Sequence, residues 1–285
     1  MRPSERSPGS KLGLMGGMGG ARVVVAAIAA SALAIVGGSP AHGATHLLVI
    51  AHNGGTEAAP ENTLAAFRHD IAVGVDGIEF GVRLSADDLP VVIHDVTLTR
   101  TTNCTGFVDA RRRDELVHCD AGSWFGPAFQ LERIPTLDQA LDVMADSSVV
   151  LYVHVKEDSP SLAEQTVRAI NAHGLAGRTI YLGTTESVLD TIRRAGGGPL
   201  CWVYSNPAGW DSDYPYLMPY AVPVSAEQVA RARARGQIVL PVENHPTPLA
   251  DMPALGANGI VVSDVDGAMD LARPTKHPHP EGPGF

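Results

Sequence analysis

The stretch His46-Leu-Leu-Val-Ile-Ala-His52 is a short apolar run that ends in a histidine, and two similar runs follow it. These are Val75-Asp-Gly-Ile-Glu79-Phe and Pro90-Val-Val-Ile-His94-Asp95. Apolar runs of this length, flanked by glycine, proline or aspartate, indicate buried strands of the kind found in parallel sheets. Because the carboxyl ends of parallel strands meet at one rim, we expect His52, Glu79 and His94 to converge there.

Strand-like and helix-like stretches alternate through the rest of the chain. Several of the helical patterns start at a serine or threonine and end near a glycine, as capped helices do. Eight strands with helices between them predict an α/β protein, a (β/α)8 TIM barrel. A doubly wound sheet is the weaker alternative, because Gly54-Gly55 after the first strand is not a G-x-G-x-x-G turn. The later strands are expected at residues 149–156, 179–183, 200–204, 237–243 and 259–263, and the helices at 62–73, 136–145, 161–173, 187–195, 225–235, 248–255 and 265–271.

A long insert follows the third strand, from Thr97 to Pro135, and is the main departure from this alternation. Loops of such length at the C-terminal rim usually shape the entrance for a substrate. We therefore expect a single barrel domain over residues 44–273, with its site beside the insert.

The two ends of the chain differ from the barrel in composition. Residues 1–43 begin with basic side chains, continue through an apolar stretch from Val23 to Val36 and reach small residues before Gly43. This pattern predicts a secretory signal peptide cleaved near Gly43 and a secreted, extracellular protein. An uncleaved membrane anchor is the alternative. Residues 274–285, rich in proline, histidine and glycine, are expected to form a flexible tail.

The chain is acidic, with a formal net charge of −10. Loss of residues 1–43 removes four basic residues and one acidic residue, which changes the charge to −13. An acidic chain repels polyanions, so we predict no nucleic-acid partner. The sequence gives no prediction of the oligomeric state.

The chain has three cysteines, which in an oxidising compartment predict one disulfide and one free thiol. Cys104 and Cys119 flank the loop that follows His94. A bond between them would close a loop of about fifteen residues and constrain the unfolded chain by about 3 kcal/mol. Cys201 opens an apolar run and is expected to be a buried side chain rather than a catalytic thiol.

Several motifs, in order, resemble the glycerophosphodiester phosphodiesterase family. The resemblance is nearly unbroken from Ile50 to about Leu141 and resumes over Gly256–Asp264. It implies a (β/α)8 barrel and the hydrolysis of a glycerophosphodiester to glycerol phosphate and an alcohol. The motifs are His52-x-Gly54, Ala59-Pro-Glu61-Asn-Thr63, Gly74-Val-Asp-Gly-Ile-Glu79, Pro90-Val-Val-Ile-His94-Asp95, Leu98-Thr-Arg100-Thr-Thr-Asn103, Asp120-Ala-Gly-Ser-Trp124 and Ile134-Pro-Thr-Leu137.

The resemblance also implies roles for single residues. In the family two histidines share the acid and base steps of phosphodiester cleavage, and here they are His52 and His94. Lys156 matches a lysine that brings positive charge to the phosphate. Asn53 and Glu61 are the other residues expected to contact phosphate or substrate.

A divalent cation, calcium or magnesium, is the cofactor that the resemblance implies. Glu79 is its expected ligand, and His154 and Glu243 are further candidates. The expected partner is a small-molecule phosphodiester or a lysophospholipid-type substrate, with a membrane only as a substrate surface.

Each of these residues also has a structural interpretation. A histidine in an apolar strand is often a hydrogen-bonded core residue. Buried Glu79 needs either a metal or a basic partner, and Lys156 is such a partner in principle. Glu61 opens the first predicted helix, where an acidic residue can simply act as a cap.

Three positions depart from the family pattern. The arginine after the first histidine is Asn53 here, the aspartate of a Glu-x-Asp motif is Gly81, and a glutamate two residues before the lysine is His154. Two carboxylate ligands are thereby lost, and imidazole favours zinc, manganese or nickel over calcium. These losses leave three hypotheses: a hydrolase with a remodelled site, a metal-poor site with altered acid–base chemistry such as cyclic phosphate formation, or a non-catalytic ligand-binding barrel.

Overall fold

The structure is a computed structural model that describes residues 46–243 and 248–273. The signal peptide predicted over residues 1–43 and the tail predicted over residues 274–285 lie outside the described residues. Within the described part of the chain, no helix is both long and apolar enough to cross a membrane.

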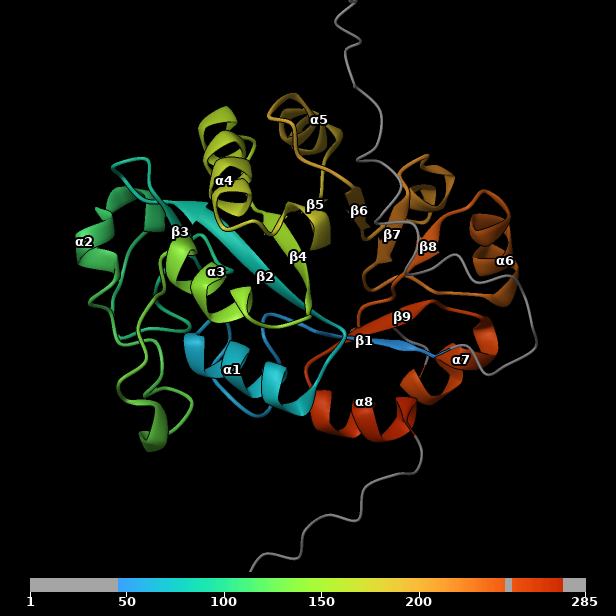
Figure 1. Ribbon diagram of the computed structural model, residues 1–285, viewed down its shortest axis with the longest axis horizontal. Helices are drawn as coiled ribbons and strands as arrows, with labels where there is room; N and C mark the ends of the chain where they lie inside the picture. Colours follow the sequence, from blue (N-terminus) through green and yellow to red (C-terminus); the bar gives the residue numbers. More distant parts are fainter. Residues whose placement is uncertain (1–45, 244–247, 274–285) are drawn as a thin grey trace, which may run out of the picture. The chain divides into compact units, whose positions relative to one another are not determined.

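Eight parallel strands form a barrel with helices on its outer side (Figure 1). They neighbour one another in the order β8, β7, β6, β5, β4, β2, β1, β9. The ring closes after β8, where the N–H of Val261 donates to the carbonyl of Pro241 at 2.9 Å and that of Glu243 to the carbonyl of Val261 at 2.8 Å. The predicted TIM barrel is confirmed. The strands are β1 Leu48–Ala51, β2 Gly77–Leu84, β4 Val150–Val155, β5 Thr179–Gly183, β6 Leu200–Tyr204, β7 Tyr216–Pro219, β8 Ile238–Val239 and β9 Gly259–Val262.

The membership of the barrel differs from the sequence prediction at two places. The run predicted as the third parallel strand is β3, Pro90–Val92, and it pairs antiparallel with the last residues of β2. An apolar run cannot show the direction of its neighbour, which explains this error. The eighth parallel strand is instead β7, between β6 and β8, which the sequence analysis missed because it is short, follows Pro215 and ends in Pro219.

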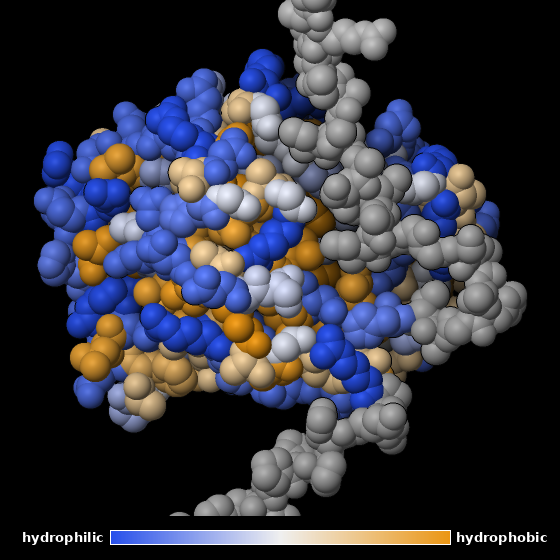
Figure 2. Space-filling view, viewed as in Figure 1, coloured by the Kyte–Doolittle hydropathy of each residue, from blue (hydrophilic) through white to orange (hydrophobic). Residues whose placement is uncertain are grey.

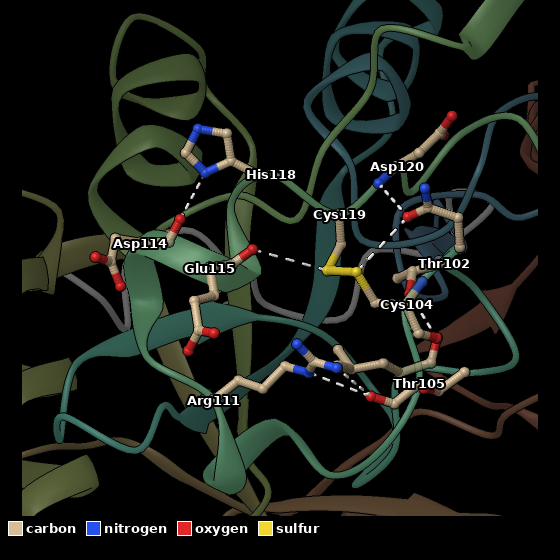
Figure 3. The surroundings of a disulfide bond; sticks show 11 residues. Thr102, Cys104, Thr105, Arg111, Asp114, Glu115, His118, Cys119 and Asp120 are labelled. Atoms are coloured by element: carbon tan, nitrogen blue, oxygen red, sulfur yellow. Dashed lines mark hydrogen bonds between the residues drawn. A yellow bond between two sulfur atoms is a disulfide. The ribbon is translucent and has the colours of Figure 1, made fainter.

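The connection from β3 to α3, residues 93–136, corresponds to the predicted insert. It contains the short helix α2, Arg113–Leu116, and two 3-10 turns, η2 Val108–Ala110 and η3 Pro127–Phe129. The predicted disulfide between Cys104 and Cys119 is confirmed, and Figure 3 shows it joining the end of the α2 segment to the segment around Thr102. The insert has its own small apolar core, which consists of Val91, Ile93, Leu98, Val108, Leu116, Cys119, Ala121 and Ile134.

Side-chain caps explain where most helices start. Thr136 and Ser225 form capping boxes with Gln139 and Gln228. Helix α1 ends at Gly74, whose φ of 82° lies in the left-handed region that favours glycine. The helices are α1 Leu64–Val73, α3 Leu137–Ala145, α4 Pro160–Ala172, α5 Glu186–Arg194, α6 Ala226–Ala234, α7 Met252–Leu255 and α8 Val265–Ala272.

Alternate residues of each strand face the inside of the barrel, and the others face the helices. The interior is a buried apolar cluster, and it includes the free thiol of Cys201. Two residues after Tyr152, on the same face of β4, comes His154, and Glu79 pairs with Tyr152 across β2 and β4. Polar side chains therefore occupy the mouth above an apolar floor, whereas hydrophobic and hydrophilic residues intermingle on the outer face seen in Figure 2. The floor is made of Ile50, Tyr152, Ile180, Leu182, Cys201, Val203, Met218, Leu240, Val242 and Val261.

Asp70 on α1 is an acidic residue without a hydrogen-bond partner in the described part of the chain. Its side chain is fully buried, and both carboxyl oxygens lack a donor. Burial, with a smaller effect of the nearby charge of Asp266, raises the pKa of Asp70 to about 8. The folded protein therefore holds a neutral carboxyl at this position at neutral pH.

We predict that Asp70→Asn makes the stability less dependent on pH. The unfolded Asp70 carboxyl loses its proton near pH 4, at about its ordinary pKa, whereas the folded one keeps it up to about pH 8. The wild type should lose stability as pH rises through this window, because its unfolded state binds fewer protons than its folded state. Urea unfolding at several pH values should show that the free energy of unfolding of the variant rises relative to that of the wild type as the pH increases through the two pKa values of Asp70.

The matched control is Asp266→Asn, since the side chain of Asp266 is 62% exposed. It should change the pH dependence far less. A constant difference between Asp70→Asn and the wild type from acidic to alkaline pH would contradict the prediction.

Candidate active site

The carboxylate of Glu79 lies at the centre of the barrel mouth. The residue is only 3% exposed on β2. One oxygen, Oε2, accepts the backbone N–H of Asn53 at 3.0 Å, and Oε1 lies 3.2 Å from Nδ1 of His154. Burial by itself raises the pKa of Glu79, but His154, Lys156 and His52 outweigh burial and hold that pKa well below its usual range. Glu79 is therefore ionised.

His154 and Lys156 extend this cluster along β4. The ammonium nitrogen of Lys156 lies 2.8 Å from Nδ1 of His154. Burial and the charge of Lys156 lower the pKa of His154 to about 4, and burial lowers the pKa of Lys156 to about 8. Nδ1 cannot accept from the ammonium and donate to Glu79 at once.

His52 follows β1 directly and is paired with a carboxylate that follows β8, which is separated from β1 by β9 alone. Its Nδ1 lies 3.0 Å from Oε1 of Glu243, after β8. Glu243 also accepts the N–H of Ser263 at 2.5 Å and the Ser263 hydroxyl. Burial lowers the pKa of His52, but the hydrogen bond to Glu243 and the charge of Glu79 outweigh burial and raise it above its ordinary value.

His94 reaches the site from the loop after β3, so it does not stand at the end of a parallel strand as the sequence analysis expected. Its Nδ1 lies 2.7 Å from Oδ1 of Asp95. Arg100 donates to Asp95 at 2.6 and 2.9 Å and to both oxygens of Glu61 at 2.6 and 2.8 Å. Burial and the charge of Lys156 lower the pKa of His94.

Two asparagines join the loop after β1 to β2. Asn53 and Asn62 have φ values of 52° and 55°, in the left-handed region that asparagine tolerates better than most residues. The N–H of Asn62 donates to the carbonyl of Asn53 at 2.7 Å, and its side-chain nitrogen lies 3.4 Å from the side-chain oxygen of Asn53. The N–H of Gly81 donates to the Asn62 side chain at 3.0 Å.

The structure thus brings together most of the predicted site residues. The charges of Glu79 and Lys156 shift the pKa of both His52 and His94, which places the two histidines around one site. Glu61 is bonded to Arg100, and Glu243 to His52 and Ser263. Asn53 is 6% exposed and directs its side chain to Asn62.

Sequence reasoning assigned no role to three residues that organise the site. Arg100 joins Asp95 to Glu61, and Ser263 orients Glu243. Arg83 donates to the backbone carbonyl of His94 at 2.9 Å. Arg100 and Ser263 lie within the motifs of the family resemblance, so the signal was present, but spacing alone could not show which carboxylates they bind.

A separate cavity of about 650 Å³ lies between α5 and the segment after β6. Trp202 and Tyr214 stack in its wall, with ring centroids 5.6 Å apart and an interplanar angle of 7°. None of the predicted site residues lines this cavity, so it is distinct from the mouth of the barrel.

The fold and the paired histidines define a barrel of the phosphodiesterase class. Residues 52–191 match the model of the Glycerophosphoryl diester phosphodiesterase family. The chain belongs to the glycerophosphodiester phosphodiesterase family, as the motifs in its sequence implied.

Individual relatives agree with this assignment. A glycerophosphodiester phosphodiesterase of Caldanaerobacter subterraneus is 40% identical over 150 residues, which cover 52% of this chain and 62% of the relative. The Bacillus subtilis protein YhdW is 52% identical over 95 residues, or 33% of this chain and 39% of that protein. The chain thus matches less than two thirds of the length of these relatives.

Among solved structures, a phosphodiesterase of Oleispira antarctica in complex with the product sn-glycerol-3-phosphate is similar to this chain. It has a TM-score of 0.72 at 25% identity, and the match covers 79% of this chain and 96% of that one.

The family generally uses divalent metals, but the donors at this mouth do not fit one. The Nδ1 atom of His154 faces the Lys156 ammonium at 2.8 Å, and a divalent cation placed beside it would be repelled. The carboxylate of Glu79 already accepts the N–H of Asn53. Within the described residues, no three histidine, cysteine, aspartate or glutamate side chains are grouped as metal ligands.

Proposed function

We propose that this chain hydrolyses phosphodiesters, with a glycerophosphodiester as substrate and glycerol phosphate and an alcohol as products. The observation that carries the proposal is the pair of histidines at one barrel mouth whose pKa values are displaced in opposite directions, upward for His52 and downward for His94. Such a separation assigns one acid and one base to the same site. The product bound to the Oleispira antarctica phosphodiesterase supports the same substrate class.

The geometry suits a single displacement at phosphorus. His94, neutral because its pKa is lowered, takes a proton from the attacking water through Nε2, since Nδ1 is bonded to Asp95. The water oxygen bonds to phosphorus as the bond from phosphorus to the alcohol oxygen breaks. His52, whose proton Glu243 helps to retain, protonates the departing oxygen. The buried ammonium of Lys156 stabilises negative charge on the phosphoryl oxygens.

We predict that the purified chain cleaves glycerophosphocholine and that His52→Ala and His94→Ala each lower kcat by about 100-fold or more. Phosphorus NMR should show a phosphate monoester as product. Lysophosphatidylcholine is a second substrate to compare, because four exposed hydrophobic residues of the insert, Val96, Phe107, Trp124 and Leu131, support a substrate with an acyl chain at a lipid surface.

His173→Ala is the matched control, since His173 caps α4 through the carbonyl of Ala169 and should leave kcat unchanged. A cyclic phosphate product would indicate intramolecular transfer instead of hydrolysis. Equal activity of the wild type and both histidine variants would refute the acid–base assignment.

We predict a bell-shaped dependence of kcat/KM on pH whose two limbs respond to different carboxylates. Activity needs neutral His94, so it falls below the pKa of His94. It also needs protonated His52 and charged Lys156, whose pKa is about 8, so it falls at alkaline pH as these two groups lose their protons. Glu243→Gln removes the carboxylate that contributes most to raising the pKa of His52 and should move the His52 part of the alkaline limb to lower pH. Asp95→Asn should lower the pKa of His94 further and move the acid limb to lower pH. Variants that shift the opposite limb, or neither limb, would contradict these assignments.

We propose further that the chain is exported and that residues 1–43 are removed. The basic start and apolar stretch of this segment support export, as does the Cys104–Cys119 disulfide, because disulfides persist in oxidising compartments. Protein recovered from the culture medium should have an N-terminal sequence that begins after Gly43. A full-length chain that stays in the membrane fraction would instead indicate an uncleaved anchor.

A further inference from the structure

We propose that in this chain the ammonium of Lys156 takes the place of the divalent cation, so that the site binds and cleaves its diester without a metal. This inference rests on the proposed hydrolysis and concerns how the same site supplies positive charge to the phosphate. Its basis is the cluster of Glu79, His154 and Lys156 at the barrel mouth.

The groups that a metal would need as ligands already have contacts within the protein. Glu79 accepts from the Asn53 backbone with one oxygen and lies 3.2 Å from His154 with the other. Nδ1 of His154 also lies 2.8 Å from the Lys156 nitrogen. The charge of Lys156 acts on both His154 and Glu79, so the cluster already contains a cation that is part of the protein.

Lys156 also lies close to the position where a side chain at residue 81 would stand. A Cβ atom at position 81 would lie 2.9 Å from Cε of Lys156, 3.0 Å from the carbonyl oxygen of Ile93 and 3.3 Å from Cα of His94. In its present position the lysine side chain thus occupies space that a side chain at position 81 would enter, and Lys156 would have to shift to admit one.

The charges of the cluster are balanced by groups of the protein itself. Replacement of two carboxylates by Gly81 and a neutral His154 leaves Glu79 as the acidic member of the cluster, and the Lys156 ammonium balances it. The other carboxylates near the mouth have their own partners: Glu61 and Asp95 bind Arg100, and Glu243 binds His52 and Ser263. A divalent cation added to this arrangement would leave an uncompensated positive charge in a buried site.

The experiment uses the purified full chain after dialysis against a chelator. Elemental analysis should find less than about a tenth of an equivalent of metal per chain. Titration calorimetry with calcium, magnesium, manganese and zinc chlorides should show no heat of binding, as expected for a site that lacks a set of available metal ligands. Turnover of glycerophosphocholine should be the same with and without chelator. One equivalent of bound divalent ion, or loss of turnover in chelator with recovery on adding a metal, would overturn the proposal.

Variants sharpen the test. Lys156→Met should lower kcat by about 100-fold or more, with no recovery on adding metals, and circular dichroism reports whether it folds. His154→Glu, which restores one carboxylate, should acquire divalent-ion binding by calorimetry, whereas the matched His154→Gln should not. Recovery of Lys156→Met by a divalent ion would overturn the proposal. If the wild type cleaves no diester under any condition, the proposed hydrolysis fails, and the calorimetry still decides whether the site takes a metal.

Discussion

The buried, ionised carboxylate of Glu79 is the interaction on which the rest of the barrel mouth depends. A charge removed from water costs several kcal/mol unless other groups compensate it. Here the compensating groups come from separate segments, the backbone N–H of Asn53 after β1 and the side chains of His154 and Lys156 on and after β4. Parallel pairing of β1 and β4 with β2 brings them together. The carboxylate therefore ties the loop after β1 to the end of β4, and His52, the proposed acid, stands at the start of that loop.

Three histidines at this mouth each have a carboxylate neighbour, yet their protonation differs. Glu243 keeps the pKa of His52 raised, because the hydrogen bond and the nearby charge of Glu79 exceed the effect of burial. His94 has Asp95, but Asp95 is itself neutralised by Arg100, and the charge of Lys156 opposes a proton on the ring. Each carboxylate raises the pKa of its histidine, but only at His52 do the carboxylates outweigh burial and the charge of Lys156. The division of labour between acid and base follows from the position of the cations.

Much of the fold was predictable from the sequence, because strands and capped helices leave local patterns. The capping boxes at Thr136 and Ser225, the alternation of apolar runs and the pairing of Cys104 with Cys119 are all properties of short segments. The errors arose where strand direction or strand pairing depends on contacts between segments that are distant in the sequence. The direction of β3 depends on its neighbour, and β7 depends on the carbonyls of Pro215 and Pro219, which pair with the next strand. Likewise the site residues were found as individuals, but the link of Arg100 to two carboxylates requires the folded insert.

The charge of the mouth also bears on which phosphate species it favours. A phosphodiester carries one negative charge, whereas a phosphate monoester carries between one and two near neutral pH. With Asn53 in place of an arginine and Lys156 in place of a metal, the fixed positive charge offered to phosphate is small, and Glu79 and Glu243 remain ionised around it. Under the proposed function, such a site is better matched to the monoanionic diester than to the more highly charged monoester product. The losses that weaken substrate binding therefore weaken product binding more, because repulsion by the carboxylates grows with the charge on the phosphate.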